Sequence, residues 1–437
     1  MAEIESLSTA GDAQADLEIA KMRLDTVRAT LTVAAGIGAA SALVLSFRRQ
    51  QHDEFHSTQQ RITELRMQAV EQLSSSDHTI RRGGLYNLER LGEQHEELRQ
   101  LVLDEICSYL RRPFAPDGAS SNDPEREVRA FAMEILGRRL KLKLGPRNYW
   151  RHTRLDLENA VLISPDFSEC RLQNADFTGA RILGYAFFQG TSFENRAWFD
   201  HVRFEGPAEF QRTKFYGAVD FEETVFSGSA DFSRAMLLGP VSFERARFAE
   251  GIGWARTQCS QIRFTEVLVE GDANFEGAVF IFRTDFARSV FTGRADFELA
   301  KFAELALFTE AEFGDSANFT DADFDWVVFE RATFRADAAF DQAVFRGLAV
   351  FRETVCTAGA SFREAYFNDA VDFARSAFLG DVLLSGALFR KMLFDQSLPG
   401  NYRPVAPRGN RELRYWTVKE LDLSEPSVPH LDPWAEP

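Results

Sequence analysis

The chain has 437 residues, a net charge of −16 and 41 phenylalanines. This length allows more than one domain, and the acidic balance excludes a nucleic-acid-binding protein of the usual basic kind, which presents positive charge to phosphates. The four cysteines, at positions 107, 170, 259 and 356, form no Cys-x-x-Cys pair, so we expect neither a zinc site nor a disulfide framework. Four buried thiols and a reducing compartment are predicted instead.

The first 47 residues divide into a polar, helical segment (1–28) and an uncharged stretch of 19 residues (29–47) bracketed by arginines. As a helix, the uncharged stretch is about 28 Å long, close to the hydrocarbon thickness of a bilayer. A secretory signal would begin nearer the terminus. The stretch therefore predicts a single-pass membrane anchor, with a buried Ala-rich helix of a soluble domain as the alternative. The flanking charges do not fix the orientation, but the unpaired cysteines favour a cytoplasmic C-terminal region at the cell membrane.

Residues 48–150 are predicted to form a small α-helical adaptor. Apolar residues recur at helical spacing, for example at Ile62, Leu65, Ala69, Val70 and Leu73. Pro113–Asn122 has the composition of a linker, and Asp123 with Pro124 provides an N-cap and a first-turn proline for the last helix. The charged residues Arg82, Glu89 and Arg90 are interpreted as surface ion pairs.

From Leu157 to Phe394, a large apolar residue returns every five or six positions, usually with Ala, Thr or Val two places earlier. Neither a helix nor a strand produces this period. Forty-five such centres follow one another, first at strict fives and, from Phe188, mostly in alternating sixes and fives. A short, fixed period is typical of a solenoid, so residues 151–395 are predicted to form one.

Many of these units read Ala-(Asp/Asn)-Phe, which resembles the motif of the pentapeptide-repeat family. Residues 175–179 read Ala-Asp-Phe-Thr-Gly and agree with that motif at every position. The resemblance implies a mainly β fold, a right-handed quadrilateral parallel β-helix with four repeats per coil. The extra residue in alternate repeats predicts a bulge at two opposite corners of each coil. About 11 coils at strand spacing give a rod on the order of 50 Å long.

The adaptor carries a second resemblance. The strings Ala-Val-Glu-Gln-Leu (69–73), Arg-Gly-Gly-Leu-Tyr (82–86) and Leu-Gly-Arg-Arg (136–139) are similar to a helical segment that precedes the repeats in membrane-anchored actinobacterial pentapeptide-repeat proteins. We expect this bundle to cover the first coil, which otherwise exposes backbone edges and apolar rings. The Pro-rich tail, residues 396–437, is predicted to be mostly irregular, and its aromatic middle, Leu413–Leu423, to cap the last coil or bind a partner.

The outer surface of the predicted rod is acidic and lacks recognisable chemistry. Residues 151–395 hold 38 acidic and 25 basic residues, and no catalytic, cofactor-binding or metal-binding motif occurs, so no enzyme, cofactor or metal is expected. One column of acidic and amide residues recurs about one coil apart on one face: Glu209, Asp231, Asn274, Asp296 and Asn318. This column is the candidate partner-binding site; the alternative is turn chemistry, because Asp and Asn side chains bond nearby backbone.

These features predict a non-enzymatic, membrane-anchored scaffold or interaction protein that binds a protein partner through the outer face or the ends of an acidic rod. The alternative comes from the family resemblance, since some pentapeptide-repeat proteins imitate duplex DNA and bind DNA gyrase. The net charge agrees with that alternative, whereas the membrane segment and the many outward-facing arginines do not. Direct nucleic-acid binding is not expected. Self-association through the membrane helix or a rod end is a further expectation.

Overall fold

A computed structural model describes residues 2–114, 123–145, 148–151 and 153–393, without the side chains of residues 2–16, 37–42, 49–58 and 144. The predicted tail, residues 396–437, and most of the predicted linker lie outside the described residues. The chain divides into two compact units, residues 1–69 and residues 70–437.

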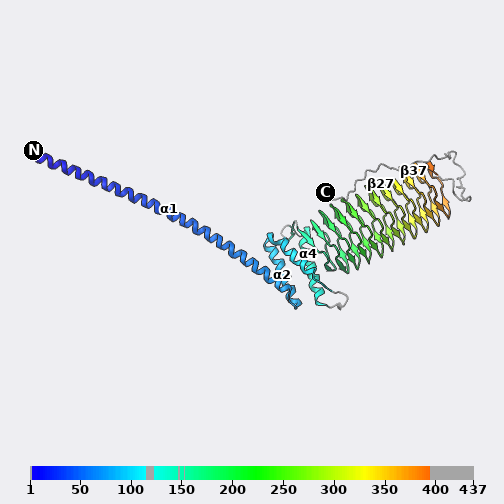
Figure 1. Cartoon of the computed structure of the whole chain (residues 1–437), viewed down its shortest axis with the longest axis horizontal. Helices are drawn as coiled ribbons and strands as arrows, with labels where there is room; N and C mark the ends of the chain where they lie inside the picture. Colours follow the sequence, from blue (N-terminus) through cyan, green and yellow to red (C-terminus); the bar gives the residue numbers. More distant parts are fainter. Residues whose placement is uncertain (1, 115–122, 146–147, 152, 394–437) are drawn as a thin grey trace. The chain divides into compact units, whose positions relative to one another are not determined.

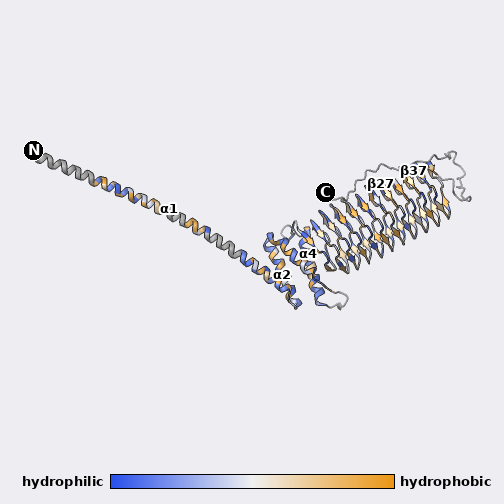
Figure 2. Ribbon diagram, in the orientation of Figure 1, coloured by the Kyte–Doolittle hydropathy of each residue, from blue (hydrophilic) through white to orange (hydrophobic). Residues whose placement is uncertain are grey.

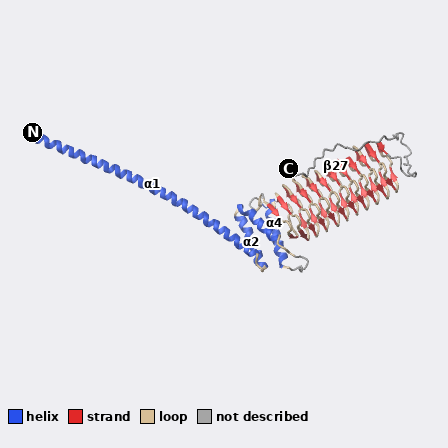
Figure 3. Cartoon of the chain, in the orientation of Figure 1, coloured by secondary structure: helices blue, strands red, loops and turns tan. Residues whose placement is uncertain are grey.

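The first unit consists of all but the last turn of one helix. Helix α1 (Ala2–Leu73) runs without a break through the predicted N-terminal segment and the predicted anchor (Figure 3). Where their side chains are described, the apolar residues of the predicted anchor are exposed. None of the described helical residues forms a span that is long and apolar enough to cross a membrane; residues 37–42, in the middle of the predicted anchor, lie outside the residues described in full.

The second unit begins with a helical bundle made of α2 (His78–Gln94), α3 (Arg99–Leu110) and α4 (Pro124–Leu140), with short 3₁₀ turns η1 (Glu96–Leu98) and η3 (Leu142–Leu144). The predicted start of α4 is confirmed, because the Asp123 carboxylate accepts a hydrogen bond of 2.9 Å from the Glu125 N–H and Pro124 occupies the first turn. An aspartate N-cap also begins α2, where Asp77 accepts from the Thr79 N–H. Leucines of α2, α3 and α4 form the buried interior of the bundle.

A parallel β-solenoid follows the bundle. Within the described residues it contains forty strands, most of them two residues long, from β1 (Arg154–Asp156) to β40 (Leu388–Leu393) (Figure 1). All strand ladders are parallel, and each strand pairs with its counterparts in the coils below and above; β10 (Ala208–Glu209), for example, pairs with β6 (Ala186–Phe187) and β14 (Ala230–Asp231). The strands form sheets of 19, 11 and 10 strands, the largest of which covers two adjacent faces. The coarse prediction of a β-solenoid of about 11 coils is confirmed.

The core of the solenoid is a set of phenylalanine ladders, which appear as the repeated apolar strand positions of Figure 2. Phe188, Phe210 and Phe232 stack almost parallel, with ring centroids 4.7 and 4.6 Å apart. Rings of the opposite face, such as Phe221, meet this ladder edge to face at 5.7 Å. The small residue two places before each centre, such as Ala208, is also buried. The predicted inward pair of one small and one large residue is therefore correct.

The four corners of a coil are of two kinds. At most five-residue corners, the second residue after the centre has a positive φ, as in Arg212 (58°) and Arg234 (60°). At the six-residue corners, glycines often stack on each other, as Gly228 does on Gly206. A coil with two corners of each kind thus alternates a left-handed turn with a bend that often contains glycine.

The prediction of a bulge at two corners of every coil is wrong. Among the described ladders, register shifts occur between Phe302 and Leu305 and between Phe367 and Ala370. At both places a six-residue corner lies on a five-residue corner of the next coil. Where two six-residue corners stack, as 215–221 does on 237–243, the strands on both sides of the corner keep the same offset of one coil. At the other mixed corners, such as 237–243 on 259–264, the offset changes by one residue between two separate strands. An inserted residue that recurs in successive coils finds its counterpart there and needs no bulge.

Candidate interaction surfaces of the solenoid

The predicted acidic and amide column lies on the 10-stranded sheet. Glu209 and Asp231 are neighbours in β10 and β14, and Asn274, Asp296 and Asn318 are neighbours in β22 (Ala273–Asn274), β26 (Ala295–Asp296) and β29 (Ala317–Asn318). Gly253 of β18 (Ile252–Gly253) separates the two groups. The structure therefore brings the five predicted residues onto one face, with one interruption.

The side chains of this column make local hydrogen bonds. Asp231 accepts from the Ser233 N–H at 2.7 Å, and Asn274 and Asn318 accept from the N–H two residues ahead at 2.9 and 3.1 Å. The Gln211 amide bridges Glu209 and Asp231, at 2.7 Å from each. These contacts are the turn chemistry that the alternative interpretation describes. Partner binding by the column stays a prediction.

A column of alternating charge follows one five-residue corner, between the β12-type (Val219–Asp220) and β13-type (Val225–Phe226) strands. Its residues all have positive φ and stand one coil apart; we call them the ion ladder: His201, Glu223, Arg245, Glu266, Arg288, Glu310, Arg331, Glu353 and Arg375. Neighbouring members pair, for example Arg245 with Glu223 at 3.1 Å and Arg331 with Glu353 at 2.9 Å. His201 lies 3.2 Å from Glu223 and is exposed, as expected of a surface histidine. Sign alternation about every 22 residues was the sequence signal for this ladder.

Beside the ion ladder, the carboxyl groups of Asp200 and Asp220 interact with each other. Burial, and then the charge of Asp220, raises the pKa of Asp200 to about 7. The Asp220 carboxylate also accepts a hydrogen bond from the Glu222 N–H. Two carboxylates that approach each other cannot both ionise freely, so this pair is a local pH-sensitive point on an otherwise regular surface.

Exposed apolar residues lie at the C-terminal ends of the β11-type (Lys214–Phe215) strands, on the 19-stranded sheet. Tyr216, Leu238 and Ile281 each follow a strand of the 19-stranded sheet, and they are 46%, 43% and 39% exposed; Phe282 next to Ile281 is 49% exposed. The backbone hydrogen bond from Leu238 N–H to the carbonyl of Phe215 places Leu238 one coil above Tyr216. We call Tyr216, Leu238, Ile281 and Phe282 the apolar stripe. The sequence reading missed it because these residues stand at positions expected to face water.

The helical bundle closes the N-terminal end of the solenoid, as predicted. The Gln100 side-chain amide both donates to the Arg154 carbonyl (3.1 Å) and accepts from its N–H (2.9 Å), so it takes the place of a strand neighbour for β1. Gly137 of α4 packs so closely that a Cβ would lie 2.3 Å from the Asp166 carbonyl oxygen. The resemblance segment Leu136–Arg139 thus contains a glycine required for helix-to-coil contact.

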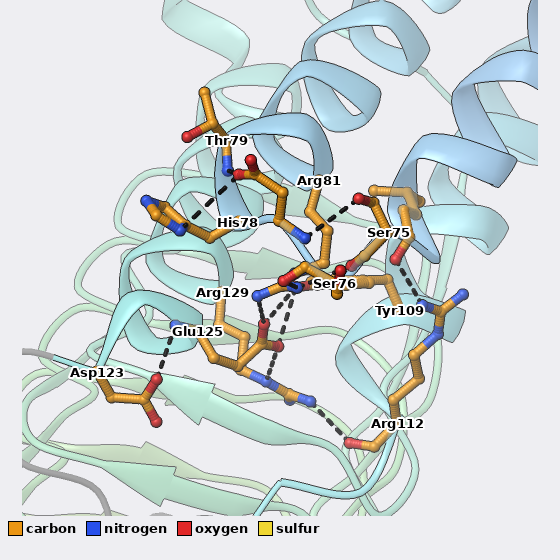
Figure 4. Close-up of polar contacts among 12 residues, drawn as sticks. Ser75, Ser76, His78, Thr79, Arg81, Tyr109, Arg112, Asp123, Glu125 and Arg129 are labelled. Atoms are coloured by element: carbon orange, nitrogen blue, oxygen red, sulfur yellow. Dashed lines mark hydrogen bonds and ion pairs between the residues drawn. The ribbon is translucent and has the colours of Figure 1, made fainter.

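A buried arginine joins the bundle to the first coils. Arg129, 1% exposed, donates to the carbonyls of Leu110 (2.8 Å), Arg112 (2.7 Å) and Val161 (3.2 Å). It is also bonded to Glu125 at 2.9 Å, and Arg81 pairs with the same carboxylate at 3.0 Å (Figure 4). These contacts hold the helical bundle against the first coils, which explains the burial of Arg129 without a bound substrate.

The interpretation of Glu89 as part of a surface ion pair is wrong. Glu89 is 4% exposed and bonded to Arg138 at 3.0 Å and to Arg139, itself 6% exposed, at 2.7 Å. Arg82 lies over the Phe131 ring at 4.6 Å, and Arg90 is exposed. The sequence of one helix shows the spacing of its charged residues. It does not show that α4 covers Glu89 while Arg90 stays exposed.

The four cysteines are free and buried, as predicted. Burial raises the pKa of Cys107, Cys259 and Cys356 to about 12. These thiols are therefore poor nucleophiles. Among the described residues, no group of His, Cys, Asp and Glu side chains could hold a metal ion.

Comparison with protein families agrees with this architecture. The family model described as pentapeptide repeats (9 copies) matches residues 167–214, 210–254, 297–343 and 340–388. A search of curated proteins finds no match. The chain is a pentapeptide-repeat β-solenoid protein. Residues 255–296, between the matched stretches, include the centres Cys259, Phe264 and Val269, which stand five residues apart, but the strand ladders continue through this interval without interruption.

Proposed function

We propose that this protein is a non-enzymatic scaffold that binds a protein partner on the outer face of its acidic rod. The apolar stripe carries the proposal. Single exposed apolar residues are normal on a protein surface, but apolar side chains at the same position in three of four successive coils, with only the buried Ser260 between Leu238 and Ile281, are typical of an interaction site. The stripe is not needed for folding, because a continuous column of buried centres, Phe215, Leu237, Cys259 and Phe280, lies beneath it.

The charge of the rod favours a partner with a basic rim around an apolar centre. The solenoid region carries a net charge of −13, from 38 acidic and 25 basic residues. Such a field speeds association with a basic surface, while the apolar contacts provide most of the affinity. A duplex-DNA mimic fits less well, because the ion ladder alternates in sign where phosphates would present one sign.

The proposal is tested by proximity crosslinking and pull-down with the full chain. A variant with Leu238→Asp and Ile281→Asp should lose a protein that the wild type captures. The matched control is Leu379→Asp, at a residue that is 71% exposed near the C-terminal end of the solenoid. This control chain should still capture that protein. Capture of the same proteins by all three chains would contradict partner binding at the stripe. A supercoiling assay with gyrase examines the alternative, which predicts inhibition by the wild-type chain.

The second part of the proposal is that residues 29–47 anchor the scaffold in the cell membrane, with the rod in the cytoplasm. It is supported by the length and lack of charge of this stretch and by its exposed side chains, such as Leu31 (64%), Leu43 (70%) and Phe47 (63%). Carbonate extraction of cell membranes provides the test. The full chain should stay in the pellet, and a chain lacking residues 29–47 should be released; release of both would contradict the anchor. Protease accessibility of the rod in intact cells reports its side of the membrane.

A further inference from the structure

A second column of residues with positive φ follows the five-residue corner between the β10-type and β11-type (Lys214–Phe215) strands. We call it the corner column, and its members are Glu169, Gly190, Arg212, Arg234, Arg256, Gly277, Leu299, Asp321, Gln342, Glu364 and Gly386. The N–H of each member from Glu169 to Glu364 donates to the next coil, as from Arg212 to the Ser233 carbonyl (3.1 Å) and from Arg234 to the Ala255 carbonyl (2.9 Å). Successive members therefore stand one coil apart, at about 4.8 Å.

The corner column does not alternate in sign as the ion ladder does. Three successive arginines, Arg212, Arg234 and Arg256, occupy one half, and the acidic residues Asp321 and Glu364 occupy the other. Glu169, at the start of the column, is paired with Lys143. Like charges on neighbouring strands destabilise a sheet. Within the described part of the chain, Arg212, Arg234, Asp321 and Glu364 form no side-chain ion pair, and Arg256 has one long contact, 3.6 Å to Glu276. Stacking of the coils does not require this separation of charge, since the ion ladder meets the same backbone demand with paired charges.

The middle of the corner column is apolar. Leu299 is 49% exposed although it has a φ of 59°, a conformation that is uncommon for residues other than glycine, asparagine and aspartate. One coil below it stands Gly277, which has no side chain. A protruding leucine thus lies next to an unfilled position, between a basic half and an acidic half.

We propose that two copies of the chain pack side by side and antiparallel along the corner column. With the two-fold axis midway between the levels of Gly277 and Leu299, Leu299 of each copy lies over Gly277 of the other. The same axis sets Arg256 opposite Asp321 and Arg212 opposite Glu364, with Arg234 opposite Gln342. Each pairing occurs twice, as a two-fold interface requires. This interface goes beyond the proposed function, because it needs no other protein and uses the opposite edge of the strands from the apolar stripe.

A second copy fits this column better than an acidic peptide does. An acidic peptide would match the three arginines but would be repelled by Asp321 and Glu364, and it would leave Leu299 exposed. An extended peptide also repeats at about 6.6–6.8 Å for residues on one side, out of step with the coil rise of about 4.8 Å. Another copy of this solenoid has the same rise, so its complementary charges stay in register over the whole column.

Sedimentation velocity of the detergent-solubilised full chain tests the proposal by charge exchange. Arg256→Glu and Asp321→Arg should each weaken the dimer at least about tenfold, because each places two like-charged pairs in the interface. The chain with both substitutions should return to within about threefold of the wild-type dissociation constant, since opposite charges face each other again. The control Arg288→Glu makes the same charge change at a positive-φ position of the ion ladder, and it should leave the dimer unchanged.

A wild-type chain that stays monomeric at every concentration overturns the proposal, as does a dimer that the single substitutions do not weaken. Failure of the double variant to recover also overturns it, and recovery excludes misfolding as the cause of the loss. None of these outcomes bears on partner capture, which is measured with the stripe variants.

Cysteine crosslinking tests the antiparallel orientation. The native cysteines are buried, so new surface cysteines can be crosslinked selectively. A tagged Arg256→Cys chain mixed with an untagged Asp321→Cys chain should form mixed dimers. Neither variant should crosslink to itself, because the identical positions of two antiparallel copies would lie about three coils, or roughly 14 Å, apart. Self-crosslinking of both variants without mixed dimers would indicate parallel packing and overturn the proposal.

Discussion

At the six-residue corners, single glycines set how closely two coils approach. A Cβ added at Gly228 would lie 2.7 Å from the Gly206 carbonyl carbon and 2.7 Å from the Pro207 nitrogen. These distances are steric clashes, and the two coils would have to move apart to relieve them. Gly228→Ala should therefore lower the free energy of unfolding by about 1–3 kcal/mol. Denaturant unfolding followed by circular dichroism gives this value.

The matched control for this prediction is Gly83→Ala in α2. Nothing lies within 4 Å of a Cβ at Gly83, and alanine is favoured over glycine inside a helix by about 0.5–1 kcal/mol. The control should therefore leave stability unchanged or raise it. Equal losses in the two variants would show that close corner contact is not the cause.

The Asp200–Asp220 pair should make stability depend on pH. Asp200 has a pKa of about 7 in the folded chain against an ordinary value of 3.8, so between these values the folded state holds a proton that the unfolded state has released. Stability should therefore fall as pH rises through this range and become level above it. Asp200→Asn should flatten the slope and raise the melting temperature above pH 7, measured by thermal unfolding across pH. An unchanged slope would assign it to other groups.

The sequence predicted the inward residues of the coil but not the corner residues, for a physical reason. A centre such as Phe221 is set by a local period, because every coil must bury its own ring. The corner features, by contrast, depend on how the backbone of the neighbouring coil stacks on the corner. They include the positive φ of Arg212 and the need for glycine at position 228. Asp200 has a raised pKa because it is buried and, second, because the charged Asp220 lies in that next coil. A residue pattern within one coil reveals neither the burial of Asp200 nor its approach to Asp220.

At the scale of elements, helix α4 and the first coils depend on the buried guanidinium of Arg129. Arg129→Met removes the partner of the Glu125 carboxylate and leaves the carbonyls of Leu110, Arg112 and Val161 without that donor. Breaking a buried charge pair in this way should cost about 3–5 kcal/mol. The free energy of unfolding measures it, with the exposed Arg90→Met as control, which should change it by no more than about 0.5 kcal/mol.

A partner substitution separates lost charge pairing from lost packing at this joint. In the Arg129→Met chain, Glu125→Gln removes the unpaired carboxylate and should recover part of the loss, although Arg81 then loses its partner as well. No recovery at all would indicate that the carbonyl contacts of Arg129 carry the whole effect. The start of α4 was predicted correctly, because its signals, the N-cap Asp123 and the first-turn Pro124, are local in the sequence. The joint was not predicted, because Arg129 and Val161 are distant in sequence.

At the scale of the whole molecule, the two ends of the solenoid differ. The first coils are covered by the helical bundle, and their centres are fully buried. At the other end, the centres Phe378, Leu384 and Phe389 are only half-buried, although the preceding centres are buried. Within the described residues nothing covers this last coil, and the chain continues from it for the 42 residues of the predicted tail, 396–437. The fold class was predictable because the repeat is strict, whereas the asymmetry of the ends follows from segments that have no repeat.

The predicted capping role of the tail leads to a test on the whole chain. If Leu413–Leu423 covers the last coil, a chain that ends at residue 395 should expose Phe378, Leu384 and Phe389, whose apolar rings and side chains would bind the dye ANS and promote end-to-end association. We expect higher ANS fluorescence and a concentration-dependent rise in scattering for the shortened chain. Substituting Leu384→Glu in that chain should suppress both signals, because it places a charge on the open end. Equal fluorescence and scattering for the full and shortened chains would exclude capping by the tail and leave partner binding as its expected role.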